Sequence, residues 1–336
     1  MTKKLQMIES NYYYIWVVIT KGCHVMDKSI KPSATSRKSG KKSLLEREDF
    51  LAYLFIAPPV LLITIFLFYP VANVFYHGFQ HHNLMRPWVD GFAGFDNFVN
   101  IFTNDNVFRS SLVISLQWVV AQVSLQLIFG MIVALLLNNA FRLRGLVRTI
   151  MFYPWAISGV LTAMMWNMMY QQHVGVINAI LLDFGIIESH IAWLANPDFV
   201  LGSVIIAGVW RGIPFFAIMI LARLQTISAD IYEASDVDGA SSIQKFVHIT
   251  LPHLKESIVL ATLLRTVWEF NAVDLIMNLT NGGPARLTTT LTMYIVNTAV
   301  TDQNFGYGSA LATVSFIILL LFAIIYLKAS KFGQEE

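Results

Sequence analysis

Four charged side chains lie within long apolar stretches of this sequence. They are Arg211, Arg265, Glu269 and Asp274. A charge in apolar surroundings is costly, so such residues are rare, usually pair with one another, and often mark a pathway for a solute, ion or proton. The chemistry to consider is therefore recognition of a polar solute, proton relay, or a structural ion pair.

Spacing relates two of these charges directly. Arg265 and Glu269 are four residues apart and share one face of a helix. In the same helix, Phe270, Asn271 and Asp274 are predicted to lie on the other side. One interpretation of Arg265 and Glu269, with or without Arg211, is an ion-pair network that holds helices together. The other is a lining for a solute pathway.

A second group of polar residues occupies positions 233–252, between two long apolar stretches. Asp230 is predicted to cap a helix with acidic residues in its first turns, which suits the helix dipole. Gly239 interrupts this helix, and an amphipathic stretch then runs through Lys245 to Pro252. We expect a helix, a bend and a second helix lying along a membrane surface. The acidic first half favours a protein partner over anionic lipid.

Composition indicates a protein that crosses a membrane several times. Of 336 residues, 56% are hydrophobic and 13% are charged, against about 25% charged in soluble domains. The single cysteine, Cys23, excludes an internal disulfide framework and a multi-cysteine metal site, and no metal site is predicted. The segment around Lys41 lacks the glycine and the hydroxyl residue of a phosphate-binding loop, so we expect no ATP hydrolysis by this chain alone.

Six apolar stretches are long enough to span a bilayer, and we expect an all-α fold because lipid leaves no partners for exposed backbone groups. Lys and Arg gather before the first stretch, in 138–150, in 222–257 and after the last, which predicts that both termini and the polar segment are cytoplasmic. Residues 1–48 are predicted to be a disordered basic tail whose first 25 residues precede an alternative start at Met26, and 331–336 a short second tail. The predicted spans are 51–76, 112–137, 151–170, 199–221, 258–279 and 308–327.

The polar segment closely resembles the EAA loop of ABC importer permeases. Glu233-Ala234-Ser235, Gly239, Ile249 and Leu251-Pro252 match the family spacing, with Ser235 in place of alanine. The resemblance covers about 50–330 and is strongest to the carbohydrate class, through RGLVRTIMFYPW from Arg144, VWRGIPFF, LLRTVWEFN and LTNGGP. It implies a type I importer permease fold, a permease domain over 49–330, and a coupling loop over 229–256 that docks on an ATP-binding subunit. The predicted coupling residues are Glu233, Ala234, Ser235, Asp236, Gly239, Ile249, Leu251 and Pro252.

The resemblance also implies the rest of the assembly. We expect a second similar permease subunit, two ATP-binding subunits that carry the ATP, and an extracytoplasmic solute-binding protein, in a bacterial inner membrane. The chain itself is expected to be a transport subunit rather than an enzyme, with no cofactor of its own and no nucleic-acid partner. A sugar is the expected solute. The resemblance places sugar contacts at Phe270 and Asn271, and the predicted pathway also includes Arg211, Glu269 and Asp274.

Two alternatives stay open. Arg211 and Arg265 could meet a phosphate or an acidic sugar, such as glycerol-3-phosphate, although Glu269 nearby would neutralise them. The buried carboxylates could instead serve an ion-coupled secondary transporter. The hypothesis of a secondary transporter leaves the EAA-like loop unexplained, and it requires internal repeats.

Overall fold

The computed structural model describes the backbone of residues 48–330 and the side chains of 53–330. The predicted tails and Cys23 lie outside this range, apart from Glu48. Helices dominate the described residues, and two compact units divide the chain after Leu62. The elements are α2 (Glu48–Ile63), η2 (Thr64–Phe68), α3 (Tyr69–Gly78), β1 (Gln80–His81), η3 (Pro87–Val89), β2 (Gly91–Phe92), α4 (Asp96–Thr103), α5 (Asn106–Asn138), α6 (Arg144–Ala156), α7 (Gly159–Met169), α8 (Val176–Asp183), α9 (Val200–Leu224), α10 (Ala229–Val237), α11 (Ser242–Lys245), η4 (Phe246–Thr250), α12 (Leu251–Asn271), α13 (Asp274–Leu279), α14 (Leu291–Val296), η5 (Asn297–Thr301) and α15 (Phe305–Ala329).

Within the described residues, four helical segments are long and apolar enough to cross a membrane. They are Tyr53–Gly78, Asn106–Asn138, Val200–Leu224 and Phe305–Ala329, which correspond to the first, second, fourth and sixth predicted spans. Helix α12 is not one of them, because Lys255, Glu256, Arg265 and Glu269 raise its polarity. The count of six spans therefore stays a prediction.

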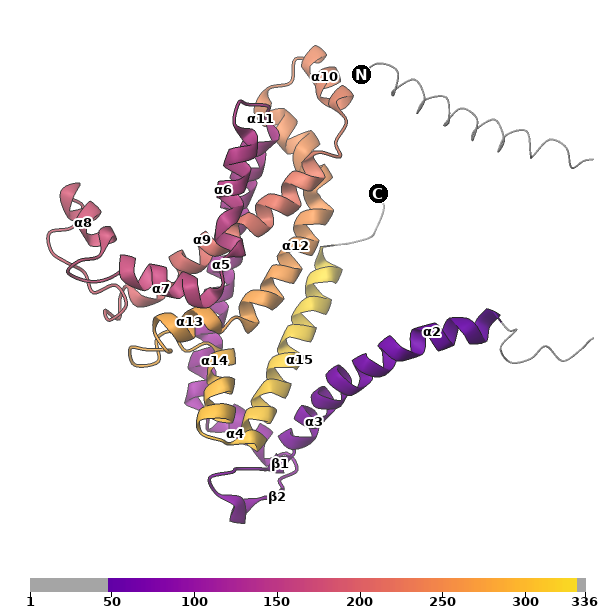
Figure 1. The fold of residues 1–336 in the computed structure, drawn as a ribbon, viewed down its shortest axis with the longest axis vertical. Coiled ribbons are helices and arrows are strands. Elements are labelled where there is room, and N and C mark those ends of the chain that lie inside the picture. The colour runs from indigo at the N-terminus through magenta and orange to yellow at the C-terminus, as the bar shows by residue number, and fades with distance from the viewer. Residues whose placement is uncertain (1–47, 331–336) are drawn as a thin grey trace, which may run out of the picture. The chain divides into compact units, whose positions relative to one another are not determined.

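The predicted third span, 151–170, is not one straight helix. Helices α6 and α7 occupy it and are bent by 99° relative to each other, so the pair is either a broken span or a re-entrant loop. The backbone is extended at Ile157 and Ser158, and the Ser158 side chain accepts a hydrogen bond from the Leu161 amide to cap α7. A serine cap starts a new helix in a new direction. In Figure 1, α7 and α8 accordingly extend to one side of the bundle.

Helices α5 and α9 pack closely and form the centre of the bundle, and α12 packs against both. Their contact surface is lined by small residues and by buried glutamines. A Cβ at Gly212 would overlap the side chain of Gln126 across the interface. Small residues let two helices in lipid approach until side-chain hydrogen bonds can form between them.

The segments that connect the long helices gather at two opposite ends of this bundle (Figure 1). The α10–α11 segment lies at one end, and the β1–β2 hairpin, α4 and the start of α15 lie at the other. The hairpin pairs Gln80 with Phe92 and His81 with Gly91. This arrangement agrees with the predicted separation of 222–257 from 77–111 and 280–307. Which end faces the cytoplasm stays a prediction.

Candidate functional site

The predicted coupling loop forms two helices with a bend between them. Helix α10 begins after Ser228, whose side chain accepts from the Asp230 amide at 3.3 Å. The predicted cap, Asp230, is therefore wrong by two residues, and Asp230 lies in the first turn instead. Its carboxylate still lies where the helix dipole favours negative charge.

Gly239 produces the bend. Its φ is +75°, in the left-handed region where a side chain is strained. Among the described residues, and apart from Gly239 and its two chain neighbours, no atom lies within 4 Å of a Cβ built there, so the requirement for glycine comes from the backbone conformation rather than from packing. The second helix then starts with a capping box formed by Ser241 and Gln244.

Two interactions between side chains join the two helices of the loop into one unit, and a third stabilises α10 itself. The hydroxyls of Tyr232 and Thr250 lie 2.9 Å apart, and Lys245 Nζ lies 2.6 Å from Asp236 Oδ1. Ser235 is buried, and its hydroxyl donates to the Tyr232 carbonyl at 2.7 Å. The side chains on the outer face of the loop are free to meet a partner: Glu233, Ala234, Val237, Asp238 and Ile243 are exposed.

The second loop helix continues into α12 without a break. Residues 242–271 are helical throughout, with a π-helical turn at η4 just before Pro252. Proline lacks an amide hydrogen and its ring crowds the preceding turn, so a wider turn accommodates it. Ile249 is half-buried, whereas Leu251 and Pro252 are exposed. The loop is thus an extension of the helix that carries Arg265 and Glu269.

Helix α12 ends at Asn271, in the middle of the predicted fifth span. Its last carbonyls receive side-chain donors: Trp118 Nε1 donates to Glu269 O at 3.1 Å, and Thr292 donates to Phe270 O at 2.7 Å. The chain is extended at Ala272, and α13 then starts at Asp274. The predicted placement of Asp274 on the opposite side of one continuous helix is therefore wrong. The break brings Asp274 to the same cavity as Glu269.

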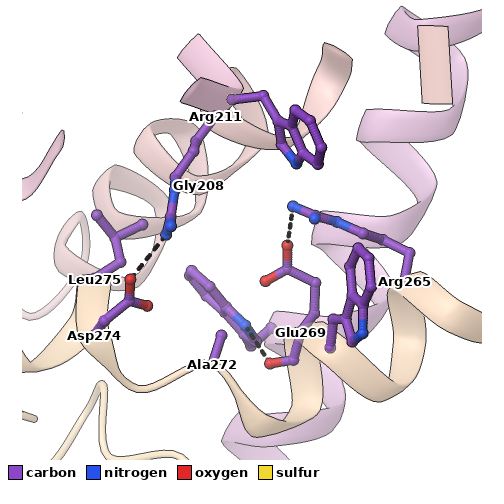
Figure 2. A pocket seen from close by; sticks show the side chains of 10 residues that line it. Gly208, Arg211, Arg265, Glu269, Ala272, Asp274 and Leu275 are labelled. Atoms are coloured by element: carbon purple, nitrogen blue, oxygen red, sulfur yellow. Dashed lines mark hydrogen bonds and ion pairs between the residues drawn. The ribbon is translucent and has the colours of Figure 1, made fainter. Parts of the chain in front are cut away.

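This cavity has a volume of about 250 Å³ and is shown in Figure 2. Three tryptophans and four charged side chains dominate its lining. The lining residues are Trp118, Trp155, Gly208, Arg211, Arg265, Trp268, Glu269, Ala272, Asp274 and Leu275. The structure thus brings together three of the predicted pathway residues, Arg211, Glu269 and Asp274.

The Arg265–Glu269 pair is largely buried. Arg265 Nη2 lies 2.6 Å from Glu269 Oε1, and the two side chains are 10% and 7% exposed. Gln126 bonds both partners: it accepts from Arg265 Nε at 2.6 Å and donates to Glu269 at 3.1 Å. Arg265 also lies over the Phe215 ring, 5.6 Å from its centroid. These contacts support the structural interpretation of this pair, because buried charges are retained only when paired and hydrogen-bonded.

The second pair, Arg211–Asp274, is more accessible. Arg211 Nη1 lies 3.0 Å from Asp274 Oδ2, and the side chains are 29% and 42% exposed. Figure 2 shows this pair on one side of the cavity and Arg265–Glu269 on the other. Gly159, the first residue of α7, packs so closely that a Cβ there would overlap the Asp274 carboxylate. Arg211 therefore pairs with Asp274 and is not hydrogen-bonded to Glu269.

The two positions predicted to contact a sugar lie outside the lining of this cavity. Phe270 is buried at 4% exposure. Asn271 is exposed, and its amide donates to the Val267 carbonyl at 2.8 Å. Their contact with a solute stays a prediction.

Sequence reasoning missed the glutamines that complete the buried network. Gln126 donates to Gln122 at 2.6 Å, and Gln122 in turn donates to the Ile205 carbonyl at 3.0 Å. Both side chains are fully buried. The signal was available, because two amides four residues apart in an apolar span share a face and need partners. Trp118 gave no such signal, since tryptophan is common in apolar spans.

Comparison with known proteins places this fold in a family. Residues 126–330 match the family described as "Binding-protein-dependent transport system inner membrane component". The chain is 34% identical to the trehalose/maltose transport system permease protein MalF of Thermococcus litoralis, over 86% of this chain and 96% of that protein. It is 35% identical to the lactose transport system permease protein LacF of Rhizobium radiobacter, over 85% of this chain and 95% of that protein.

Two further similarities, one of them to a solved structure, bear on the family and on the fold. The sulfoquinovosyl glycerol transport system permease protein SmoG of Agrobacterium fabrum is 35% identical over 84% of this chain and 90% of that protein. A chain from the crystal structure of a bacterial ABC transporter involved in the import of the acidic polysaccharide alginate has a TM-score of 0.74 at 23% identity, over 85% of this chain and 97% of that chain. The fold, the family match and the relatives agree, and this chain belongs to the family of binding-protein-dependent transport system inner membrane components.

Proposed function

We propose that this chain is a permease subunit of an ATP-driven importer that carries a sugar or oligosaccharide across a bacterial inner membrane. The observation that carries the proposal is the continuous helix from Ser242 to Asn271. One end of it is tied into the exposed loop around Glu233, and the other end contributes Arg265, Trp268 and Glu269 to the cavity.

The loop is proposed to couple transport to ATP hydrolysis on a partner. Closure of two ATP-binding subunits would push the exposed face around Glu233, Ala234 and Gly239. Because the loop is internally bonded and continuous with α12, that push would tilt α12 and change the cavity at its far end. A second similar permease subunit would complete the pathway, and a solute-binding protein would deliver the cargo from outside. Family membership supports this ATP-driven scheme over an ion-coupled secondary transporter.

The cavity supports a carbohydrate as the cargo. Trp155 and Trp268 are each 49% exposed and offer ring faces on which the apolar face of a pyranose can pack. The Arg211–Asp274 pair offers both donors and acceptors to hydroxyl groups. Maltose, trehalose and lactose occur in the names of the relatives.

An anionic sugar is the second candidate cargo. It is favoured by the 35% identity to a permease named for sulfoquinovosyl glycerol, whose sulfonate is negatively charged. Arg211 is the more accessible of the two cations lining the cavity and is the group that would meet such a charge.

Replacing glycine in the loop tests the coupling role. Gly239→Ala forces a side chain into a left-handed backbone at a cost of about 1–2 kcal/mol, so we expect weaker co-purification of the ATP-binding subunit and lower uptake, with normal membrane insertion. Gly145→Ala is the matched control, because a Cβ at Gly145 would lie in open space among the described residues and its φ is not positive. Glu233→Ala is expected to act like Gly239→Ala. Unchanged uptake and co-purification in both loop variants would refute the coupling role.

A further inference from the structure

The charges in the cavity cancel in two separate pairs. Its lining holds two arginines and two carboxylates, and each arginine has its own carboxylate within 3.0 Å. The net formal charge of the lining is therefore zero. The charge that a solute meets in the cavity depends on which pair it can reach. This inference rests on the proposed function of the cavity as a sugar site.

The two pairs differ in access. Arg265 pairs with Glu269 through Nη2 and Oε1, Gln126 is hydrogen-bonded to both residues, and little of either side chain is exposed. Arg211 and Asp274 are held by one hydrogen bond between them and keep 29% and 42% of their side chains exposed. A solute entering the cavity meets the Arg211–Asp274 pair.

Asp274 is held in its position beside Arg211. Its carboxylate lies against Gly159 with no room for even a methyl group between them. Its own backbone carbonyl accepts from Asn278 at 2.7 Å within the first turn of α13. Helices α7 and α13 pack against each other. An incoming anion therefore cannot push this carboxylate toward α7 to take its place on Arg211.

We propose that Asp274 determines the charge of the cargo. By neutralising Arg211, it leaves the cavity suited to an uncharged sugar and opposed to one that carries a carboxylate or sulfonate. An anionic group beside Arg211 would lie next to the Asp274 carboxylate, and like charges at such distances disfavour each other strongly. The paired charges still bond hydroxyls, because Arg211 donates and Asp274 accepts. Specificity of this kind depends on a repulsive group as much as on attractive ones.

The test compares matched neutral and anionic sugars on the assembled transporter. The probes are maltitol and maltobionate, lactitol and lactobionate, and methyl glucoside and methyl glucuronide, in which each pair exchanges a hydroxymethyl group for a carboxylate. Dissociation constants are measured by saturation-transfer NMR on the complex of permease and ATP-binding subunits. The solute-binding protein is omitted so that its own selectivity does not enter. The measured quantity is the anionic-to-neutral ratio of dissociation constants.

We expect the wild type to bind the neutral probe of at least one pair about tenfold or more tighter than its anionic partner. Asp274→Asn is expected to lower this ratio by about tenfold, equivalent to about 1.4 kcal/mol. Arg211→Gln is expected to raise the ratio. The double variant, neutral at both positions, is expected to return it close to the wild-type value. Asp183→Asn, an exposed carboxylate at the end of α8, is the control and leaves the ratio unchanged.

The outcomes distinguish failure of the role assigned to Asp274 from failure of the sugar cargo. A wild type that binds an anionic probe more tightly than its neutral partner overturns the assignment of Asp274. So does an unchanged ratio in both single variants when they assemble with the ATP-binding subunits. A wild type that assembles and couples to ATP hydrolysis but binds no probe of any pair overturns the sugar cargo itself, and the role of Asp274 falls with it.

Discussion

The hydroxyls of Tyr232 and Thr250 lie 2.9 Å apart and join the first helix of the loop to the helix that continues into α12. Thr250 is buried at 5% exposure, so this contact is protected from water. It lies between the exposed face around Glu233 and the long helix that ends in the cavity. In the proposed coupling, a push on that face would therefore be transmitted to α12 rather than absorbed by a flexible connection.

Removing this contact should uncouple ATP hydrolysis from transport. Tyr232→Phe deletes one hydroxyl and leaves the ring, which costs about 1 kcal/mol for a hydrogen bond. We expect fewer solute molecules carried per ATP hydrolysed, with the ATP-binding subunit still attached. Tyr153→Phe, at an exposed tyrosine in α6, is the control. An unaltered transport-to-ATP ratio in Tyr232→Phe would show that the loop does not depend on this contact.

The buried Arg265–Glu269 pair is expected to contribute to the stability of the folded protein. Glu269→Gln leaves the Arg265 charge buried without its counter-charge, and breaking a buried pair costs about 3–5 kcal/mol. We expect a clear drop in the thermal unfolding midpoint of the purified complex. The double variant Arg265→Gln with Glu269→Gln should recover much of the loss, because no unpaired charge remains.

An exposed ion pair supplies the control for that experiment. Glu256 lies 3.7 Å from Arg223, and its side chain is 64% exposed. Pairs of this kind contribute about 0–1 kcal/mol, so Glu256→Gln should scarcely move the midpoint. Equal shifts of the thermal unfolding midpoint in Glu269→Gln and Glu256→Gln would contradict the structural role of the buried pair.

The close contact at Gly159 leads to another prediction. In Gly159→Ala the new methyl group overlaps the Asp274 carboxylate, and overpacking of this kind costs about 1–3 kcal/mol. We expect reduced stability and weaker sugar binding, since the Arg211–Asp274 pair must shift. Gly202→Ala in α9 places its methyl group in open space and should have neither effect. Full sugar binding in Gly159→Ala would show that the position of Asp274 tolerates movement.

The sequence predicted the features that depend on local spacing. The bend at Gly239, the two-helix loop and the Arg265–Glu269 pair all follow from residues within a few positions of each other, and all are confirmed. The N-terminal cap of α10 was predicted two residues too late, at Asp230 instead of Ser228, because serine and aspartate are both good caps.

Features that depend on contacts between distant segments could not be predicted in this way. Arg211 and Asp274 are 63 positions apart, and their pairing requires α12 to end at Asn271. That ending depends on donors from Trp118 and Thr292, which lie on other helices. The bend at Ser158 was likewise hidden, because residues 151–170 are mainly apolar and carry no charged side chain, so composition alone predicts one span.

Site-specific photo-cross-linking tests whether the exposed loop contacts an ATP-binding subunit. A photoreactive residue at Val237, which is 89% exposed in the loop, is compared with one at Val174, which is 87% exposed between α7 and α8. In the assembled transporter we predict a cross-link to the ATP-binding subunit from Val237 and none from Val174. No cross-link to that subunit from Val237, or one from Val174 instead, would contradict the account.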